Sequence, residues 1–170
     1  MMTTPDAARF DDTSSTRSTT AGSMLRELTY RYQTKKTPAG DCVSLGATMS
    51  DASVVARALT SLLRDEAVEV FGILCLTTKH RVICWHEVSR GCLDSTVVHP
   101  REVFKAAVLA NSASIIVAHN HPSGDPTPSP HDFELTRRLA AAGALLGIDV
   151  LDHIVIGDGS FVSFRQIGGL

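Results

Sequence analysis

The segment HNHPSGDPTPSPHD, residues 119–132, restricts the possible folds more than any other part of the sequence. It holds four of the chain's seven prolines, and prolines fix φ and cannot donate a backbone hydrogen bond. Three of them alternate at positions 126, 128 and 130, which predicts a stiff, extended connector rather than helix or central strand. Three histidines and two aspartates on such a rigid loop indicate a metal site.

The spacing of the acidic and imidazole groups indicates which residues could bind the ion. His119 and His121 are two residues apart, so both imidazoles point the same way on extended backbone. This pair alone is weak evidence, because two surface histidines in a loop look the same. Asp132 follows at the expected start of a helix, where the helix dipole favours a carboxylate. Two imidazoles and a carboxylate suit zinc and leave a fourth position for water, as in hydrolytic sites.

Ser129 has two interpretations that the residues leave open. The stretch SPHD puts a serine at an N-cap and a carboxylate three residues later, which is close to a capping box. A serine fixed in that geometry is also well placed to reach a group bound to a metal.

Hydrophobic periodicity predicts one α/β domain with mixed strands and helices around a single sheet. Ser50 or Asp51 can cap a first helix, Pro100 suits the first turn of a second, and Pro130 opens a third that Gly147 can end. The apolar stripe of the third helix is expected to run from Leu135 to Leu146. The expected strands are 28–32, 67–77, 81–88, 114–118, 148–156 and 161–164, with hairpins at 78–80 and at GDGS.

Composition favours some classes of protein over others. A chain of 170 residues with 44% hydrophobic content suits one domain, expected at residues 25–170 after a disordered Ser/Thr-rich tail at 1–24. A net charge of -2 lacks the basic excess that DNA binding usually needs. The sequence shows no apolar leader and no run of about 18 apolar residues, so neither export nor a membrane partner is expected. Four cysteines without CxxC spacing indicate a reducing compartment, so we expect a cytoplasmic protein.

The spacing HxH, seven residues, Ser129, two residues and Asp132 resembles the JAMM signature of the JAB/MPN metalloprotease superfamily. The stretches HNHPSGDPTPS, VHPREVFK and LDHIVIGDGSFVSF look like the RadC-like branch, and the likeness runs from about Leu25 to the C-terminus. The resemblance implies a JAB/MPN-type, cytidine-deaminase-like fold: one mixed β-sheet flanked by helices.

The resemblance also implies a mechanism for hydrolysis of a peptide or isopeptide bond. Zinc held by His119, His121 and Asp132 would present a water that a glutamate deprotonates for attack on the amide carbonyl. The stretch EVFGILCL is similar to the one that carries this glutamate, which nominates Glu69 at the start of a strand, on the face of Phe71, Ile73 and Cys75.

Other roles in the reaction are assigned from the same resemblance. Ser129 would donate a hydrogen bond to the developing oxyanion. Glu87 is the alternative to Glu69 as general base. Asp152 and His153 either orient a ligand or form a structural pair, so we leave them out of the predicted site. The identity of the protein or peptide substrate does not follow from the sequence.

Two alternatives to a hydrolase stay open. One is a DNA-repair or recombination accessory that acts by binding; longer relatives carry a helix-hairpin-helix segment for this, which the Ser/Thr-rich residues before Leu25 cannot supply. The other is a zinc-binding pseudo-enzyme that docks a partner. An HNH nuclease is excluded because its motif residues are not consecutive, and a zinc deaminase needs HxE and PCxxC, which are absent.

Overall fold

The computed structural model describes residues 31–33, 44–91 and 98–170, and residues 33–170 form one compact unit. The predicted tail at 1–24, the boundary at residue 25 and most of the predicted strand at 28–32 lie outside the described residues. Arg31, Tyr32 and Gln33, which are described, are not in a strand.

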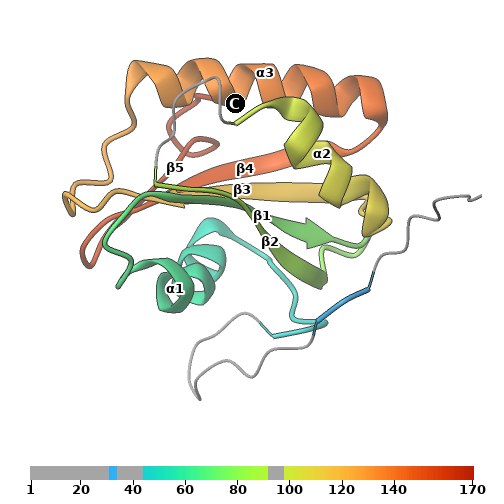
Figure 1. Ribbon diagram of the computed structural model, residues 1–170, viewed down its shortest axis with the longest axis horizontal. Helices are drawn as coiled ribbons and strands as arrows, with labels where there is room; N and C mark the ends of the chain where they lie inside the picture. Colours follow the sequence, from blue (N-terminus) through green and yellow to red (C-terminus); the bar gives the residue numbers. More distant parts are fainter. Residues whose placement is uncertain (1–30, 34–43, 92–97) are drawn as a thin grey trace, which may run out of the picture. The chain divides into compact units, whose positions relative to one another are not determined.

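Within the described residues, a mixed sheet of five strands is flanked by three helices, which confirms the expected α/β fold (Figure 1). The strand order is β2-β1-β3-β4-β5. None of the helices in this part of the chain is long and apolar enough to cross a membrane. The elements are α1 (Ala52–Leu63), β1 (Val70–Leu76), β2 (Val82–Arg90), α2 (Pro100–Leu109), β3 (Ser114–Asn120), α3 (Pro130–Leu146), β4 (Asp149–Ile156) and β5 (Phe161–Ser163).

The directions of the central strands bring three segment ends to one edge of the sheet. β1 pairs antiparallel with β2 and β3, whereas β3 pairs parallel with β4 through the crossover helix α3. In this register Phe71 lies opposite His119, and His119 lies beside Val155. The start of β1 and the ends of β3 and β4 therefore meet where the proline-rich segment begins.

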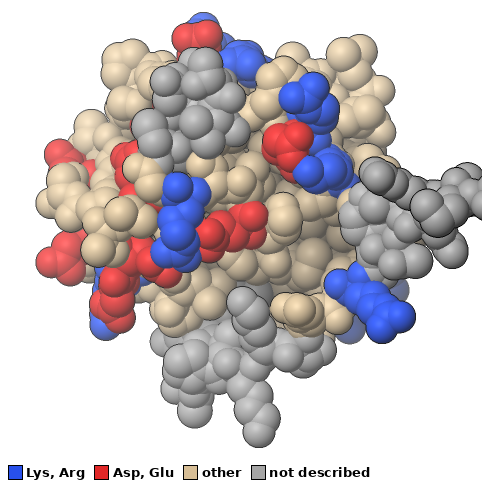
Figure 2. Space-filling view, viewed as in Figure 1, with Lys and Arg blue, Asp and Glu red and all other residues tan. Residues whose placement is uncertain are grey.

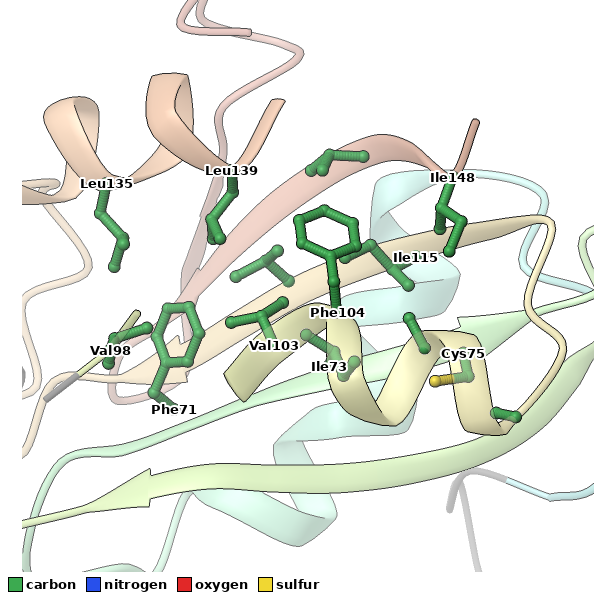
Figure 3. Packing of buried hydrophobic residues seen from close by; sticks show 14 residues of the cluster. Phe71, Ile73, Cys75, Val98, Val103, Phe104, Ile115, Leu135, Leu139 and Ile148 are labelled. Carbon is green, nitrogen blue, oxygen red and sulfur yellow. The ribbon is translucent and has the colours of Figure 1, made fainter. Parts of the chain in front are cut away.

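The sheet is covered on both faces, α1 on one side and α2 with α3 on the other (Figure 1). Figure 3 shows the layer under α2 and α3, where Phe71, Leu135 and Leu139 point toward one another. Every residue of β1 and β3 is buried, which explains why both strands read as continuous apolar runs. The alternation of Phe71, Ile73 and Cys75 on one face of β1 is confirmed, because all three belong to this layer.

The helix ends follow the predicted local chemistry. Asp51 caps α1 by accepting from the N–H groups of Ser53 and Val54, and Pro100 begins α2. Gly147 ends α3 in the left-handed conformation, with φ 68°. The two hairpins are also confirmed, β1 with β2 and β4 with β5.

Several details of the prediction were wrong. β1 begins at Val70 rather than 67, and β3 continues through Asn120. Leu146 is 52% exposed, although it was expected on the apolar stripe of α3. Gly143 is buried instead, because the connection from α3 to β4 folds back against the helix, and a Cβ at Gly143 would lie 2.4 Å from the carbonyl oxygen of Ile148. The last turn of α3 therefore exposes its leucines.

Candidate metal centre

The three predicted metal ligands come together at the end of β3. The candidate ligand atoms of His119, His121 and Asp132 all lie within 4.8 Å of one another. His119 Nε2 is 3.0 Å from His121 Nε2 and 3.4 Å from Asp132 Oδ1, and His121 Nε2 is 3.8 Å from Asp132 Oδ2. Ligand atoms about 2 Å from a tetrahedral ion are about 3.3 Å apart, so the group has the dimensions of a metal site.

His119 is the last but one residue of β3 and has no exposed surface. Its ring stacks on Phe71 with 6.2 Å between ring centroids. Burial lowers the pKa of His119 to about 4; Asp132 opposes this shift and His121 adds to it. The imidazole is therefore neutral at neutral pH, as a metal ligand must be.

His121 is held by the proline-rich segment that follows β3. Its backbone N–H donates to the carbonyl of Ile156 (2.9 Å), and its Nδ1 lies 2.7 Å from the carbonyl oxygen of Asp125. A carbonyl oxygen can only accept, so Nδ1 carries a proton and the ring turns Nε2 toward His119 and Asp132.

The same segment is docked on the turn between β4 and β5. The N–H of Asp158 donates to the carbonyl of Gly124 (2.8 Å). A Cβ on Gly157 would lie 2.4 Å from that carbonyl oxygen and 2.7 Å from Pro126 Cδ. Only glycine allows so close an approach, and the contact fixes the loop that carries His121.

Asp132 is buried in the first turn of α3, where Ser129 orients its carboxylate. Oδ2 accepts from the backbone N–H and from the hydroxyl of Ser129, both at 2.7 Å, while Ser129 Oγ accepts from the N–H of Asp132. The predicted capping box is thus confirmed. Because Oδ2 takes both bonds, Oδ1 is left to face His119.

A second layer of polar residues lies behind His119. His119 Nδ1 is 2.8 Å from His153 Nε2, and His153 Nδ1 is 2.6 Å from Thr136 Oγ1. Asp152 has a different role, since it accepts from the N–H groups of His153 and Arg165 and from the hydroxyl of Ser163. The sequence left two interpretations open for this pair. Asp152 has a structural role, whereas His153 contacts the candidate ligand His119.

Glu69 lies one residue before β1, not within the strand as expected, and is half-buried. The neighbouring backbone is held by Asn120, whose Oδ1 accepts from the N–H of Val70 (2.8 Å) and whose Nδ2 donates to the carbonyl of Val68 (3.1 Å). The carbonyl of Glu69 itself accepts from the N–H of Gly91 (2.8 Å). Glu69 thus extends β1 at the end where Phe71 faces His119.

Glu87, the alternative base, lies on β2 and binds a cation. Its carboxylate is 2.8 Å from the guanidinium of Arg90, which also binds Glu66. The predicted site omits His153, although this residue is named above as a possible partner of a ligand, and it misses Thr136, which carries no motif signal.

The donor set consists of two imidazole nitrogens and one carboxylate oxygen, which come from the end of β3, the loop that follows it and the first turn of α3. All three side chains are at least partly buried, and both rings are fixed by hydrogen bonds at Nδ1. Such a set fits a divalent first-row transition metal and, with three protein ligands, allows a further position for water or substrate.

Comparison with known proteins agrees with this geometry. The family model described as RadC-like JAB domain matches residues 49–169, which include every residue of the site. A UPF0758 protein of Alkaliphilus oremlandii is 50% identical over 112 residues, 66% of this chain and 48% of that protein. A UPF0758 protein of Geotalea uraniireducens is 56% identical over 105 residues, 62% of this chain and 46% of that protein.

A UPF0758 protein of Methanosarcina barkeri is 51% identical over 106 residues, 62% of this chain and 46% of that protein. The chain spans about half the length of the curated relatives it matches. With its family model, its α/β fold and its His-His-Asp group in agreement, the chain belongs to the RadC-like JAB domain family.

Proposed function

We propose that this chain is a zinc-dependent metallopeptidase or isopeptidase of the JAMM type, which hydrolyses an amide bond with a glutamate general base. The observation that carries the proposal is the convergence of His119, His121 and Asp132, with both rings held so that Nε2 faces the carboxylate. Structural zinc sites take four protein ligands, whereas a set of three leaves one position for water or substrate.

Zinc is the metal proposed, because two imidazoles and a carboxylate are ligands that it prefers in hydrolytic sites. Held by His119, His121 and Asp132, it would supply Lewis acidity, which polarises the substrate carbonyl and lowers the pKa of water.

The proton transfers are assigned to Glu69. Its carboxylate would accept a proton from the attacking water and deliver it to the nitrogen of the leaving amine. This role is supported by its place at the start of β1, beside the end of β3, and by the hydrogen bonds that hold both neighbouring residues.

The proposed role of Ser129 requires its hydroxyl to change partner. The hydroxyl now donates to Asp132 Oδ2, and the backbone N–H of Ser129 donates to the same oxygen. Rotation of Oγ toward the substrate carbonyl would leave the backbone bond in place, so Asp132 would keep its orientation while the oxyanion gains a donor.

A protein or peptide is the proposed substrate, and the cytoplasm the proposed compartment. The compartment is supported by Cys75 and Cys84, which are free thiols paired in register across β1 and β2. Neighbouring thiols persist in reducing compartments.

The alternative, an accessory that binds DNA, finds little support on the face of the molecule that Figure 2 shows. On the face in Figure 2, basic and acidic side chains lie beside each other. Arg90 binds Glu66 and Glu87, and Glu102 binds Arg101 and Lys105. Paired cations offer little net charge to a phosphate backbone.

Metal analysis and a substrate screen test the proposal. We expect one zinc per chain, its loss in His119→Ala and Asp132→Ala, and its retention in Glu69→Gln, which should lose hydrolysis of peptide and isopeptide substrates. His86→Ala and Glu87→Gln are matched controls on β2 that should keep both zinc and hydrolysis.

An undiminished zinc content in a His119→Ala/His121→Ala double variant would refute the metal site. Cleavage by the Glu69→Gln variant would refute Glu69 as the general base. Tight, salt-sensitive DNA binding that does not depend on zinc would favour the DNA-binding accessory.

A further inference from the structure

We infer that Thr136 and His153 are positioning residues that keep the ring proton of His119 on Nδ1 and so leave Nε2 bare for the metal. The inference rests on the metal site of the proposed function and not on hydrolysis. It follows from three hydrogen bonds that run in sequence from the backbone of α3 to β4 and then to β3.

The first bond sets the direction of the other two. Thr136 Oγ1 lies 2.6 Å from the carbonyl oxygen of Asp132 and 2.6 Å from His153 Nδ1. Two oxygens at that distance need a proton between them, and the carbonyl can only accept. The single hydroxyl proton of Thr136 is therefore donated to Asp132, and Oγ1 must accept from His153.

The second bond fixes the tautomer of His153. This ring has no exposed surface and packs against Phe71 and Phe164, an apolar setting that disfavours the charged imidazolium. A neutral imidazole carries one proton, which is used at Nδ1, so Nε2 has a lone pair. Because that nitrogen is 2.8 Å from His119 Nδ1, His119 must donate.

The third bond leaves the ligand nitrogen bare. His119 is buried and neutral, so the proton on Nδ1 leaves only a lone pair on Nε2. This nitrogen faces His121 Nε2 at 3.0 Å, from which it can accept, and Asp132 Oδ1 at 3.4 Å. The series thus begins at the backbone carbonyl of Asp132 and returns to its carboxylate, which links two ligands through α3 and β4.

Aromatic packing keeps the His153 ring in this orientation. The ring stacks on Phe164 with 4.7 Å between centroids and an interplanar angle of 15°. Phe71 meets it edge-on with 5.9 Å between centroids and an angle of 79°. A ring held between two phenyl groups cannot rotate freely, so the hydroxyl of Thr136 decides which nitrogen is protonated.

The opposite order of protons would block the site. If Thr136 donated to His153, then His153 would donate to His119, and the proton of His119 would move to Nε2 in place of the metal. Thr136→Val removes the hydroxyl but keeps the branched shape, and so removes the preference between the two orders.

Two measurements test the inference without any assay of hydrolysis. In metal-free protein with ¹⁵N-labelled histidine, long-range ¹H–¹⁵N correlations should show protonated Nδ1 and bare Nε2 for both His119 and His153. Competition with a chromophoric chelator should show zinc affinity 10- to 100-fold lower in Thr136→Val, the usual effect of losing a group that orients a ligand. Thr136→Ser, which restores the hydroxyl, should recover most of that affinity.

Thr60→Val is the matched control. Thr60 Oγ1 makes the same type of bond in α1, to the carbonyl of Ala56 at 2.7 Å, but contacts no imidazole in any described interaction. It should lower the free energy of unfolding by a similar amount and leave zinc affinity unchanged. A wild-type spectrum with the proton on Nε2 of His119 would overturn the inference even if Thr136→Val failed to fold. Equal zinc affinity in Thr136→Val and wild type would also overturn it, whatever the protein hydrolyses.

Discussion

The side-chain oxygen of Asn120 accepts a hydrogen bond from the backbone N–H of Val70, at 2.8 Å, from a position 50 residues later in the chain. The amide nitrogen of Asn120 donates to Val68 and, more weakly, to Glu66. The residue between the two histidines of the HNH stretch therefore holds the segment that carries Glu69, and couples the proposed base to the metal ligands.

Asn120→Asp should separate this coupling from metal binding. The carboxylate keeps an oxygen that accepts from the N–H of Val70, but its second oxygen faces the carbonyl of Val68, to which the amide nitrogen now donates. Because two acceptors then meet and a charge is buried, we expect the free energy of unfolding to fall by about 1–3 kcal/mol. We also expect kcat at least 10-fold lower, with one zinc still bound. Urea unfolding, metal analysis and steady-state kinetics measure these effects. Asn111→Asp, at an exposed position, is the control. An unchanged kcat in a destabilised Asn120→Asp protein would contradict the coupling.

Gly157→Ala should displace the loop that carries His121. A Cβ there meets the carbonyl of Gly124, a backbone atom that can move only with the loop. Overpacking of this kind costs about 1–3 kcal/mol of unfolding free energy. Zinc affinity should fall too, which chelator competition measures. Asp158→Ala, in the same turn, keeps its Cβ and N–H and should bind zinc normally. If Gly157→Ala bound zinc as tightly as wild type, His121 would not depend on the docked loop.

Ser129→Ala and Ser129→Gly should separate capping from chemistry. Both remove the hydroxyl, but at an N-cap alanine costs about 1 kcal/mol of stability and glycine only a few tenths. If the hydroxyl acts in the reaction, kcat falls equally in both variants although their unfolding free energies differ. Recovery of kcat in the glycine variant alone would reduce Ser129 to a cap.

The metal-free protein should lose stability as the pH falls through the range set by its buried histidines. His119, which faces Asp132, His121 and His153, has its pKa lowered to about 4, and the pKa of His153 is lowered as well. The unfolded chain titrates near 6.5 and binds more protons in this range, so stability is complete above pH 6.5 and falls toward pH 4.

The slope of the unfolding free energy against pH has an upper limit and can be tested with a control variant. Each imidazole contributes at most about 1.4 kcal/mol per pH unit. Urea unfolding of chelator-treated protein at a series of pH values measures the slope, which should be shallower in His153→Gln. A free energy of unfolding that is constant from pH 7 to 5 would show that the histidines are not buried as neutral rings.

The ligand group was predictable from the sequence because its members lie within one segment. Alternation on extended backbone predicted that His119 and His121 share a side, and helix-capping chemistry placed Asp132. The third helix was predictable for the same reason, since Ser129, Pro130 and Gly147 are local signals.

The residues behind the ligands were not predictable, because their roles depend on tertiary contacts. Thr136 is an unremarkable threonine in a helical pattern, and only the packing of α3 on β4 brings it to His153. Asn120 lies inside the motif, but its partners at Val68 and Val70 follow from the β1–β3 register. Leu146 was assigned to the core because periodicity does not show where a helix passes the edge of its sheet.

One carboxylate, that of Asp132, both starts α3 and completes the donor set. Metal binding and folding of the first turn of α3 are consequently linked equilibria. A change that unfolds this turn lowers the metal affinity, and a bound ion stabilises the turn by mass action. Chelation therefore perturbs the architecture itself as well as the chemistry, and the amides that exchange fastest in the stripped protein should mark the point where α3 begins.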